Sequence, residues 1–247
     1  MTIEIVRDVE YTSGGIRMRG MLLAASARQE APTVVLIHDA FGLGGFSLAE
    51  AERYAGLGYT VFAADVWGDR ATETDSSAIG PRIGAVVGDR DAWIARIAAA
   101  HDTARAQPEV DPERIVTVGY CFGGASALEF ARTGGRVRGV VAIHPGLDLL
   151  DPGAVWTPAP GLNVLVSAGA IDPMATPEQR ASLQAGMDAA EVEWELDLYS
   201  GTTHAFTNPH LTDSPHPDLF AYEPRSAARS QRATTHFLVE IIPGVTG

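Results

Sequence analysis

Short apolar runs rich in β-branched residues alternate along this chain with longer segments whose apolar residues recur near the helical period of 3.6. The short runs predict strands at 3–9, 16–24, 33–38, 60–65, 115–119, 137–143, 162–168 and 192–199. The longer segments predict helices at 47–57, 92–106, 122–132, 177–190 and 224–241. Such alternation is typical of a mostly parallel sheet of about eight strands with helices on both faces.

The order of these segments adds detail to the expected fold. Only the turn Ser13-Gly14-Gly15 separates the first two strands, which predicts an antiparallel hairpin at one edge of the sheet. The segments 147–161 and 208–224 are rich in proline, so we expect a surface connection in the first and at most a short helix in the second. No repeat interrupts the pattern, and residues 1–247 are expected to form a single α/β domain.

The amino-acid composition excludes several classes of function. The chain carries 31 acidic and 18 basic residues and a net charge of -13, so its surface should repel nucleic acids and anionic membranes. All the basic residues are arginines, which excludes Schiff-base, pyridoxal-phosphate and phosphate-loop lysines. We therefore expect a small molecule as the partner, with no nucleic acid and no membrane.

A single cysteine rules out an intrachain disulfide and a paired redox motif, which fits a reducing cytosol. The first residues carry charges where a secretory signal would be apolar, and no run approaches the roughly 18 apolar residues of a membrane span. We expect a cytoplasmic protein that is a monomer or a small homo-oligomer.

The cysteine lies in the motif Gly-Tyr-Cys-Phe-Gly-Gly at 119–124, between a predicted buried strand and a predicted helix. This is the pattern of a nucleophile elbow, in which the sharp turn tolerates little beyond glycine two residues before and after the nucleophile. The helix start would favour the thiolate of Cys121. The alternative is a buried structural cysteine, which the two spaced glycines disfavour. Ser126 is a weaker candidate because it lies inside the predicted helix.

In such a fold the acid and then the base follow later strands. Asp172 follows the strand at 162–168, and His204 follows the strand at 192–199. We expect His204 to take the thiol proton and Asp172 to hold its ring. Either residue alone could be an ordinary loop residue, so the prediction depends on their coincidence with the elbow. His144 and Asp148 come in the wrong order, and we interpret His144 as a wall of the substrate pocket.

The segment His-Asp-Ala-Phe-Gly at 38–42 follows the third predicted strand, where the second oxyanion donor belongs. The amides of Ala40 and Phe122 would then bind the oxyanion, each contributing roughly 3 kcal/mol. Asp39 would lie close enough to touch the thiol.

Three histidines, His204, His210 and His216, recur every six residues. Their spacing matches no metal-ligand motif, so we predict neither a metal site nor any other cofactor.

Together these segments, with 169–172 and Thr-His-Ala-Phe at 203–206, resemble the dienelactone hydrolase (carboxymethylenebutenolidase) family over essentially the whole chain. The resemblance implies an α/β-hydrolase fold and cleavage of a small lactone or carboxylic ester through a Cys-His-Asp triad and a thioester. It also implies that Asp39 stands where the family more typically has a glutamate that contacts the cysteine and helps couple thiolate formation to substrate binding.

One position departs from the family. Its best-known members have an arginine four residues after the histidine to hold a substrate carboxylate, and this chain has Asn208. Dienelactone would be a poor substrate unless Arg82 or another arginine holds its carboxylate instead. The pocket could instead take a neutral ester or lactone. The residues expected to line it are Phe41, His144, Phe206 and Asn208. A ligand-binding or redox-sensing protein on a hydrolase scaffold, or a serine-type esterase, is the alternative.

Overall fold

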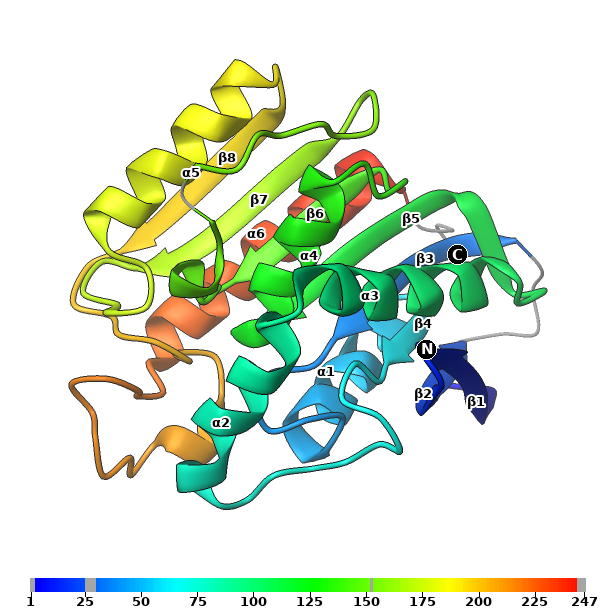
Figure 1. The fold of residues 1–247 in the computed structure, drawn as a ribbon, viewed down its shortest axis with the longest axis horizontal. Coiled ribbons are helices and arrows are strands. Elements are labelled where there is room, and N and C mark those ends of the chain that lie inside the picture. Colours follow the sequence, from blue (N-terminus) through cyan, green and yellow to red (C-terminus); the bar gives the residue numbers. More distant parts are fainter. Residues whose placement is uncertain (1–2, 25–29, 152, 244–247) are drawn as a thin grey trace.

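The computed structural model describes residues 3–24, 30–151 and 153–243, which build a central sheet of eight strands in the order β1-β2-β4-β3-β5-β6-β7-β8 (Figure 1). The strands are β1 (Ile5–Ser13), β2 (Ile16–Ala24), β3 (Ala31–Ile37), β4 (Thr60–Ala64), β5 (Val110–Tyr120), β6 (Gly139–Ile143), β7 (Asn163–Gly169) and β8 (Glu193–Tyr199). Strands β3 to β8 are parallel, and β2 is antiparallel to both β1 and β4. The predicted hairpin at the sheet edge is confirmed.

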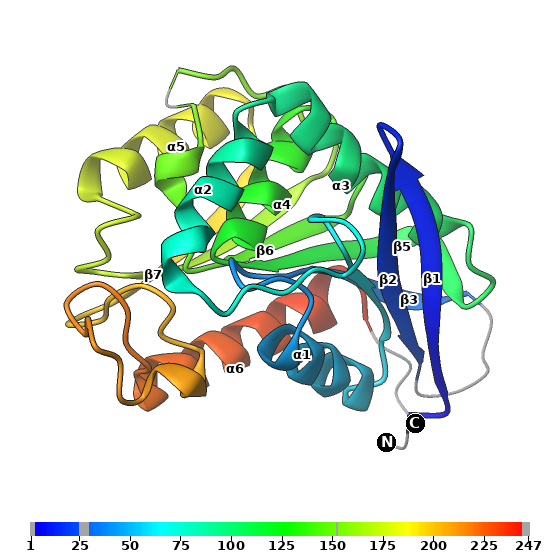
Figure 2. The same ribbon diagram turned by 60° about the horizontal axis from the view of Figure 1, so that its bottom comes forward.

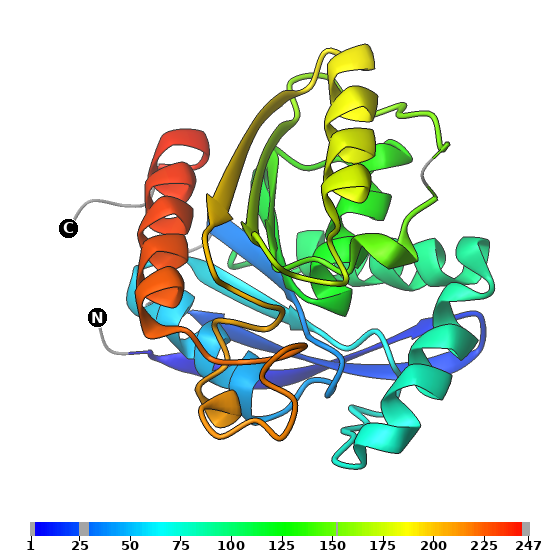
Figure 3. The same cartoon turned by 90° about the vertical axis from the view of Figure 1, so that its left-hand side faces the viewer.

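Helices cover both faces of this sheet (Figure 2). They are α1 (Gly45–Gly56), α2 (Ser76–Val87), α3 (Arg90–Arg105), α4 (Phe122–Arg132), α5 (Pro177–Ala189) and α6 (Pro224–Ile241), with short 3₁₀ turns η1 (Leu147–Leu149) and η2 (Pro209–Leu211). Helices α1 and α6 pack on one face, and α3, α4 and α5 pack on the other (Figure 3). Each face therefore has its own apolar core, and the predicted arrangement of helices on both faces is confirmed.

Two expectations need correction. Helix α2 was not predicted, because Gly80, Pro81 and Gly84 lower its helical propensity. Asp75 precedes this helix, and its carboxylate accepts a hydrogen bond from the Ser77 amide and caps the helix. The segment 147–161 is not only a surface connection, because it begins with η1 and buries Leu147 against α4.

The parallel strands all have their C-terminal ends on the same side of the molecule, and the loops that follow β3, β5, β7 and β8 gather there (Figure 1). This side is where ligands bind in open α/β sheets. In the part of the chain that the structure describes, no helix combines the length and apolarity needed to cross a membrane.

Candidate active site

Cys121 is the single residue between the end of β5 and the start of α4. Its backbone is in an unusual conformation, with φ 54° and ψ -116°, and its amide donates to the Ile143 carbonyl at 3.0 Å. A non-glycine residue at positive φ is strained and persists only where its surroundings hold it. The fold thus bends the chain sharply at this cysteine and leaves its side chain partly exposed at the sheet edge.

The two flanking glycines permit this bend. A Cβ on Gly119 would lie 2.0 Å from the carbonyl oxygen of Gly123, and one on Gly123 would lie 2.3 Å from that of Ile37. Both contacts are with backbone, which cannot move aside. The elbow is therefore packed directly against the end of β3, the strand that leads into the predicted oxyanion turn.

The predicted acid and base meet beside this elbow. The Nδ1 atom of His204 lies 2.8 Å from Oδ2 of Asp172, and both side chains are fully buried. The other carboxylate oxygen accepts from the Met174 amide at 2.8 Å, which holds Asp172 in place. Nδ1–H therefore donates to Asp172, and Nε2, without a hydrogen bond among the described residues, is the nitrogen left for proton transfer.

The charges around His204 favour its protonated form. Burial lowers the pKa of this histidine, but the nearby Cys121 thiolate and the Asp172 carboxylate outweigh burial and raise the pKa to about 10. An imidazole that is stabilised as the cation by a neighbouring sulfur is the partner that a thiolate nucleophile needs. The thiol and the ring are thus electrostatically coupled.

A second histidine fixes the turn after β3. His38 is fully buried, its Nδ1 lies 2.7 Å from the Asp39 carbonyl oxygen, and its Nε2 accepts from the Val66 amide at 3.2 Å. Burial lowers the pKa of His38, so the ring is neutral and carries its proton on Nδ1. Its ring stacks on Phe122 with centroids 6.0 Å apart. His38 thus ties the turn to the start of α4, a role that its place at the end of a strand did not reveal.

The two expected oxyanion donors belong to the segments that this contact joins. Phe122 is the first residue of α4, so its amide is one of those that find no acceptor within the helix. In the turn after β3, the Phe41 amide donates to the Asp39 carboxylate and the Gly42 amide to the Asp39 carbonyl. Ala40 makes no such bond among the described residues, which leaves its amide available to a ligand.

Asp39 is buried at the side of the site. Burial raises its pKa to about 6, against the opposing effects of the Phe41 amide and the positive charge of His204. The carboxylate is therefore within electrostatic reach of the triad, although no hydrogen bond joins it to Cys121 among the described contacts.

A cavity of about 470 Å³ opens beside Asp39. Phe41 and Asn208 both line it, and the side-chain oxygen of Asn208 accepts from the His210 amide at 3.0 Å. Cys121 and His204 are not part of this wall, whereas Asp39, which interacts electrostatically with His204, is.

Arg82, the candidate replacement for the missing arginine, lies on α2. Its guanidinium is 4.8 Å above the Trp67 ring and 3.7 Å from the carboxylate of Glu73, which also lines the cavity. The positive charge near this opening is thus paired with an acidic residue.

Two residues expected in the substrate pocket lie outside this cavity. His144 and Phe206 are fully buried, and neither lines the cavity beside Asp39. Their rings contact each other and stand behind His204, because His144 lies 5.2 Å from the His204 ring by centroid distance. His144 therefore packs against the His204 ring, Phe206 packs against His144, and neither forms the wall of this cavity.

A buried polar network lies under the elbow. The hydroxyl of Tyr120, the residue before the cysteine, donates to Glu50 at 2.6 Å and lies 3.0 Å from the Tyr54 hydroxyl. Arg53 pairs with Glu50 at 2.7 Å. The motif gave no sign of this network, because its members come from α1 and β5, which are far apart in the sequence.

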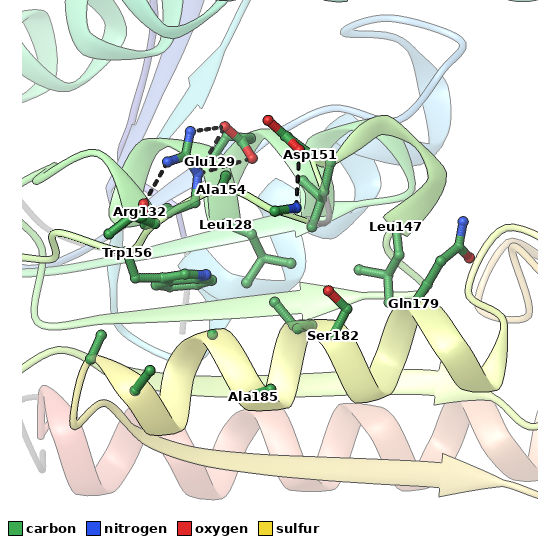
Figure 4. A pocket seen from close by; sticks show the side chains of 17 residues that line it. Leu128, Glu129, Arg132, Leu147, Asp151, Ala154, Trp156, Gln179, Ser182 and Ala185 are labelled. Atoms are coloured by element: carbon green, nitrogen blue, oxygen red, sulfur yellow. Dashed lines mark hydrogen bonds and ion pairs between the residues drawn. The ribbon is translucent and has the colours of Figure 1, made fainter.

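A further cavity of about 360 Å³ lies between α4, η1 and α5 (Figure 4). Its walls are largely apolar, with Leu128 and Trp156 facing it, and its buried Glu129 is already paired with Arg132 at 2.7 Å. No member of the predicted triad lines it. Among the described residues, no group of three histidine, cysteine, aspartate or glutamate side chains is placed to hold a metal ion.

Comparison with known proteins gives consistent matches. A family model described as the dienelactone hydrolase family matches residues 18–242. A crystal structure of a dienelactone hydrolase-like promiscuous phosphotriesterase from metagenomic libraries is 33% identical, covers 96% of this chain and 98% of its own, and superposes with a TM-score of 0.87.

Two curated relatives match at lower coverage or identity. "Protein usf" of Aquifex pyrophilus is 23% identical over 247 residues, which is 95% of this chain and 98% of that protein. Carboxymethylenebutenolidase 1 of Cupriavidus pinatubonensis is 31% identical over 129 residues, which is 50% of this chain and 55% of that protein.

Proposed function

This chain belongs to the dienelactone hydrolase family of ester and lactone hydrolases and has its α/β-hydrolase fold, and from that premise we propose that it cleaves a small carboxylic ester or lactone with the triad Cys121, His204 and Asp172. The observation that carries the proposal is the arrangement of the His204 ring. Asp172 occupies its Nδ1 at 2.8 Å, while Nε2, which makes no other hydrogen bond within the described part of the chain, is available to Cys121 on its strained elbow, close enough to raise the His204 pKa. A nucleophile, a base and a group that orients the base are the parts that acyl transfer requires.

In the first half of the reaction, the Cys121 sulfur attacks the substrate carbonyl carbon and a tetrahedral oxyanion forms. The amides of Ala40 and Phe122 stabilise this oxyanion. As the carbon–oxygen bond breaks, protonated His204 gives its Nε2 proton to the leaving oxygen. The product of this half is a thioester on Cys121. A lactone ring opens at this step, and its new hydroxyl remains on the same acyl chain.

In the second half, water attacks the thioester. His204, now neutral, takes a proton from the water, and the thiolate leaves as the carboxylic acid product forms. No redox change occurs, and no cofactor enters the reaction. All these groups come from one chain, so a monomer or a homo-oligomer can carry the activity in the cytoplasm.

The charge of the pocket favours a neutral substrate. The cavity beside the site is lined by Asp39 and Glu73, and Asn208 presents an amide where a carboxylate-binding arginine would stand. Arg82 is near this opening, but Glu73 accompanies it at 3.7 Å. A substrate carboxylate would meet at least as much negative as positive charge, so we propose a neutral ester or lactone.

Phosphotriester cleavage is a second candidate activity. The observation that favours it is the relative of 33% identity whose printed name is that of a promiscuous phosphotriesterase. Attack of the Cys121 sulfur on phosphorus would displace the aryl oxide, and the same two amides would face the phosphoryl oxygen.

The test compares wild type with Cys121→Ala on short p-nitrophenyl esters, neutral enol lactones, their carboxylate-bearing counterparts and paraoxon. We expect turnover of the neutral esters and lactones by wild type only, together with inactivation by iodoacetamide. Wild-type turnover in Cys121→Ala would refute the triad. A permanent acyl adduct without repeated turnover would favour a binding or sensing protein, and insensitivity to iodoacetamide would favour a serine-type esterase.

A further inference from the structure

We propose that His144 is a positioning residue for His204: its neutral ring, anchored to Thr207, holds the plane of the catalytic imidazole so that Nε2 faces Cys121. This inference rests on the proposed function, which assigns the base role to His204. It concerns a residue that follows β6 and lies in neither the triad nor the cavity beside Asp39.

The two imidazole rings are in direct contact. Their centroids are 5.2 Å apart with an interplanar angle of 66°, which is the edge-to-face geometry that aromatic pairs prefer. Both rings are buried. The hydrogen bond from Nδ1 to Asp172 restrains one atom of the His204 ring, but coupled changes of the two side-chain torsions can still shift Nε2. A second ring pressed against the first restricts these changes.

The ring of His144 is itself held from several sides. Its Nε2 lies 2.8 Å from the Thr207 hydroxyl, and its backbone amide donates to Ser167 at 2.7 Å. Tyr120 and Phe206 contact the ring at centroid distances of 5.8 and 5.3 Å. Thr207 is three residues after His204 in the same loop, so this anchor links the supporting ring to the loop that carries the base.

Two features of His144 are unfavourable for stability. Its backbone has φ 36°, which is strained for a side chain of this size, and its Nδ1 is buried without a partner among the described residues. A phenylalanine of similar shape would avoid the unpaired nitrogen. Packing alone therefore does not explain a histidine here, whereas the bond to Thr207 and the contact with His204 do.

The electrostatic surroundings agree with this role. Burial and the positive charge of His204 lower the pKa of His144, so it stays neutral while its neighbour is protonated. Among the described residues, the other titratable groups that interact electrostatically with His204 are Cys121, Asp172, Asp39 and Asp148. The other titratable side chain in contact with the His144 ring is Tyr120. A positively charged ring at 144 would repel the imidazolium that the reaction needs.

His101 supplies a matched control. It is also buried, its Nε2 lies 3.2 Å from the Thr117 hydroxyl, its Nδ1 has no partner among the described residues, and its ring stacks on Phe130. It makes no described contact with the triad. His101→Phe therefore removes the same chemical group from the same kind of environment without touching His204.

The experiment measures kcat, KM, the melting temperature and the rate of Cys121 alkylation by iodoacetamide between pH 5 and 9, for His144→Phe, His101→Phe and Thr207→Val. Because a small displacement of a catalytic group has a large effect, we expect His144→Phe to lower kcat roughly tenfold to 100-fold with little change in KM. Alkylation near pH 6 should slow in His144→Phe only, while the melting temperature changes no more than in His101→Phe, which loses an equivalent bond to a threonine hydroxyl. Thr207→Val should show a smaller loss of kcat in the same direction, which keeps the proposal testable if His144→Phe does not fold.

Wild-type kcat and an unchanged alkylation profile in His144→Phe would overturn the proposal, as would an equal loss of kcat in His101→Phe. The alkylation profile reports the coupling of Cys121 to His204 without requiring turnover. Failure of the proposed function would instead appear as turnover in Cys121→Ala, so the two failures are distinguishable.

Discussion

Gly169, the last residue of β7, lies so close to Thr202 that a Cβ at this position would be 2.2 Å from the Thr202 carbonyl oxygen. This contact brings the loop that carries Asp172 against the loop that carries His204. The Ile171 amide also donates a hydrogen bond to the Thr202 carbonyl oxygen, at 3.2 Å. The distance between Asp172 and His204 therefore depends on residue 169 being a glycine, with no side chain.

We expect Gly169→Ala to separate the two loops. Overpacking against backbone costs about 1–3 kcal/mol of stability, and the displacement of Asp172 from His204 should lower kcat at least about tenfold. Urea unfolding and steady-state kinetics measure the two effects. Gly80→Ala on α2 is a control outside the site, because Gly80 is not at positive φ and a Cβ there would meet nothing within 4 Å. A Gly169→Ala enzyme with wild-type kcat would show that the loop contact does not set the triad.

Asp172→Asn should keep the shape of the site but weaken the support for the His204 cation. The carboxylate that favours the protonated ring is lost, so the pKa of His204 should fall. We expect kcat to drop by roughly 10³-fold or more, as for the equivalent change in serine hydrolases. Steady-state kinetics and thiol alkylation near neutral pH measure the change. Asp188→Asn, which alters an aspartate bonded to Trp194 at 2.8 Å outside the site, should leave both unchanged.

Asp39 should reduce stability at neutral pH. Its pKa is raised to about 6 from 3.8, so the folded protein holds a proton that the unfolded chain releases between these values. Stability is therefore lost as the pH rises through about 6, by about 2–3 kcal/mol in all. Asp39→Asn cannot ionise, and it should be more stable than wild type at pH 8 by that amount, with the difference vanishing toward pH 4. Urea unfolding at several pH values measures this; an equal difference at pH 8 and pH 4 would contradict the burial argument.

The network under the elbow offers a stability test. Tyr120→Phe removes the hydroxyl that donates to buried Glu50 at 2.6 Å, which should cost about 1–3 kcal/mol in unfolding free energy. Tyr59 is the control, because its buried hydroxyl has no partner among the described residues. Tyr59→Phe should be neutral or slightly stabilising, and equal effects of the two changes would argue against the network.

The nucleophile elbow could be predicted from the sequence because the sharp turn requires glycines at fixed spacing around Cys121. A side chain on Gly119 would meet Gly123 within the same motif, whereas one on Gly123 would meet Ile37 of β3, and both demands leave glycines in one short segment. The positions of Asp172 and His204 followed from the order of strands along the chain. Their hydrogen bond at 2.8 Å joins the two residues that this order singled out.

Features that depend on contacts between distant segments could not be predicted from the sequence. Helix α2 was missed because its own residues disfavour a helix, while Arg82 stacks on Trp67 from another part of the chain. His144 and Phe206 were expected to line the pocket because each follows a strand near the site. That position does not determine which way a side chain points: both are buried, with His144 against the His204 ring and Phe206 against His144.

The most direct test of the account is to trap the acyl group during turnover. The enzyme is mixed with a short p-nitrophenyl ester and quenched in acid within one turnover, and the digested peptides are analysed by mass spectrometry. We predict the acyl mass on the peptide that contains Cys121, and its absence in Cys121→Ala. The acyl group on another residue, such as Ser126, or turnover without any acylated peptide in the quenched samples, would contradict the cysteine mechanism.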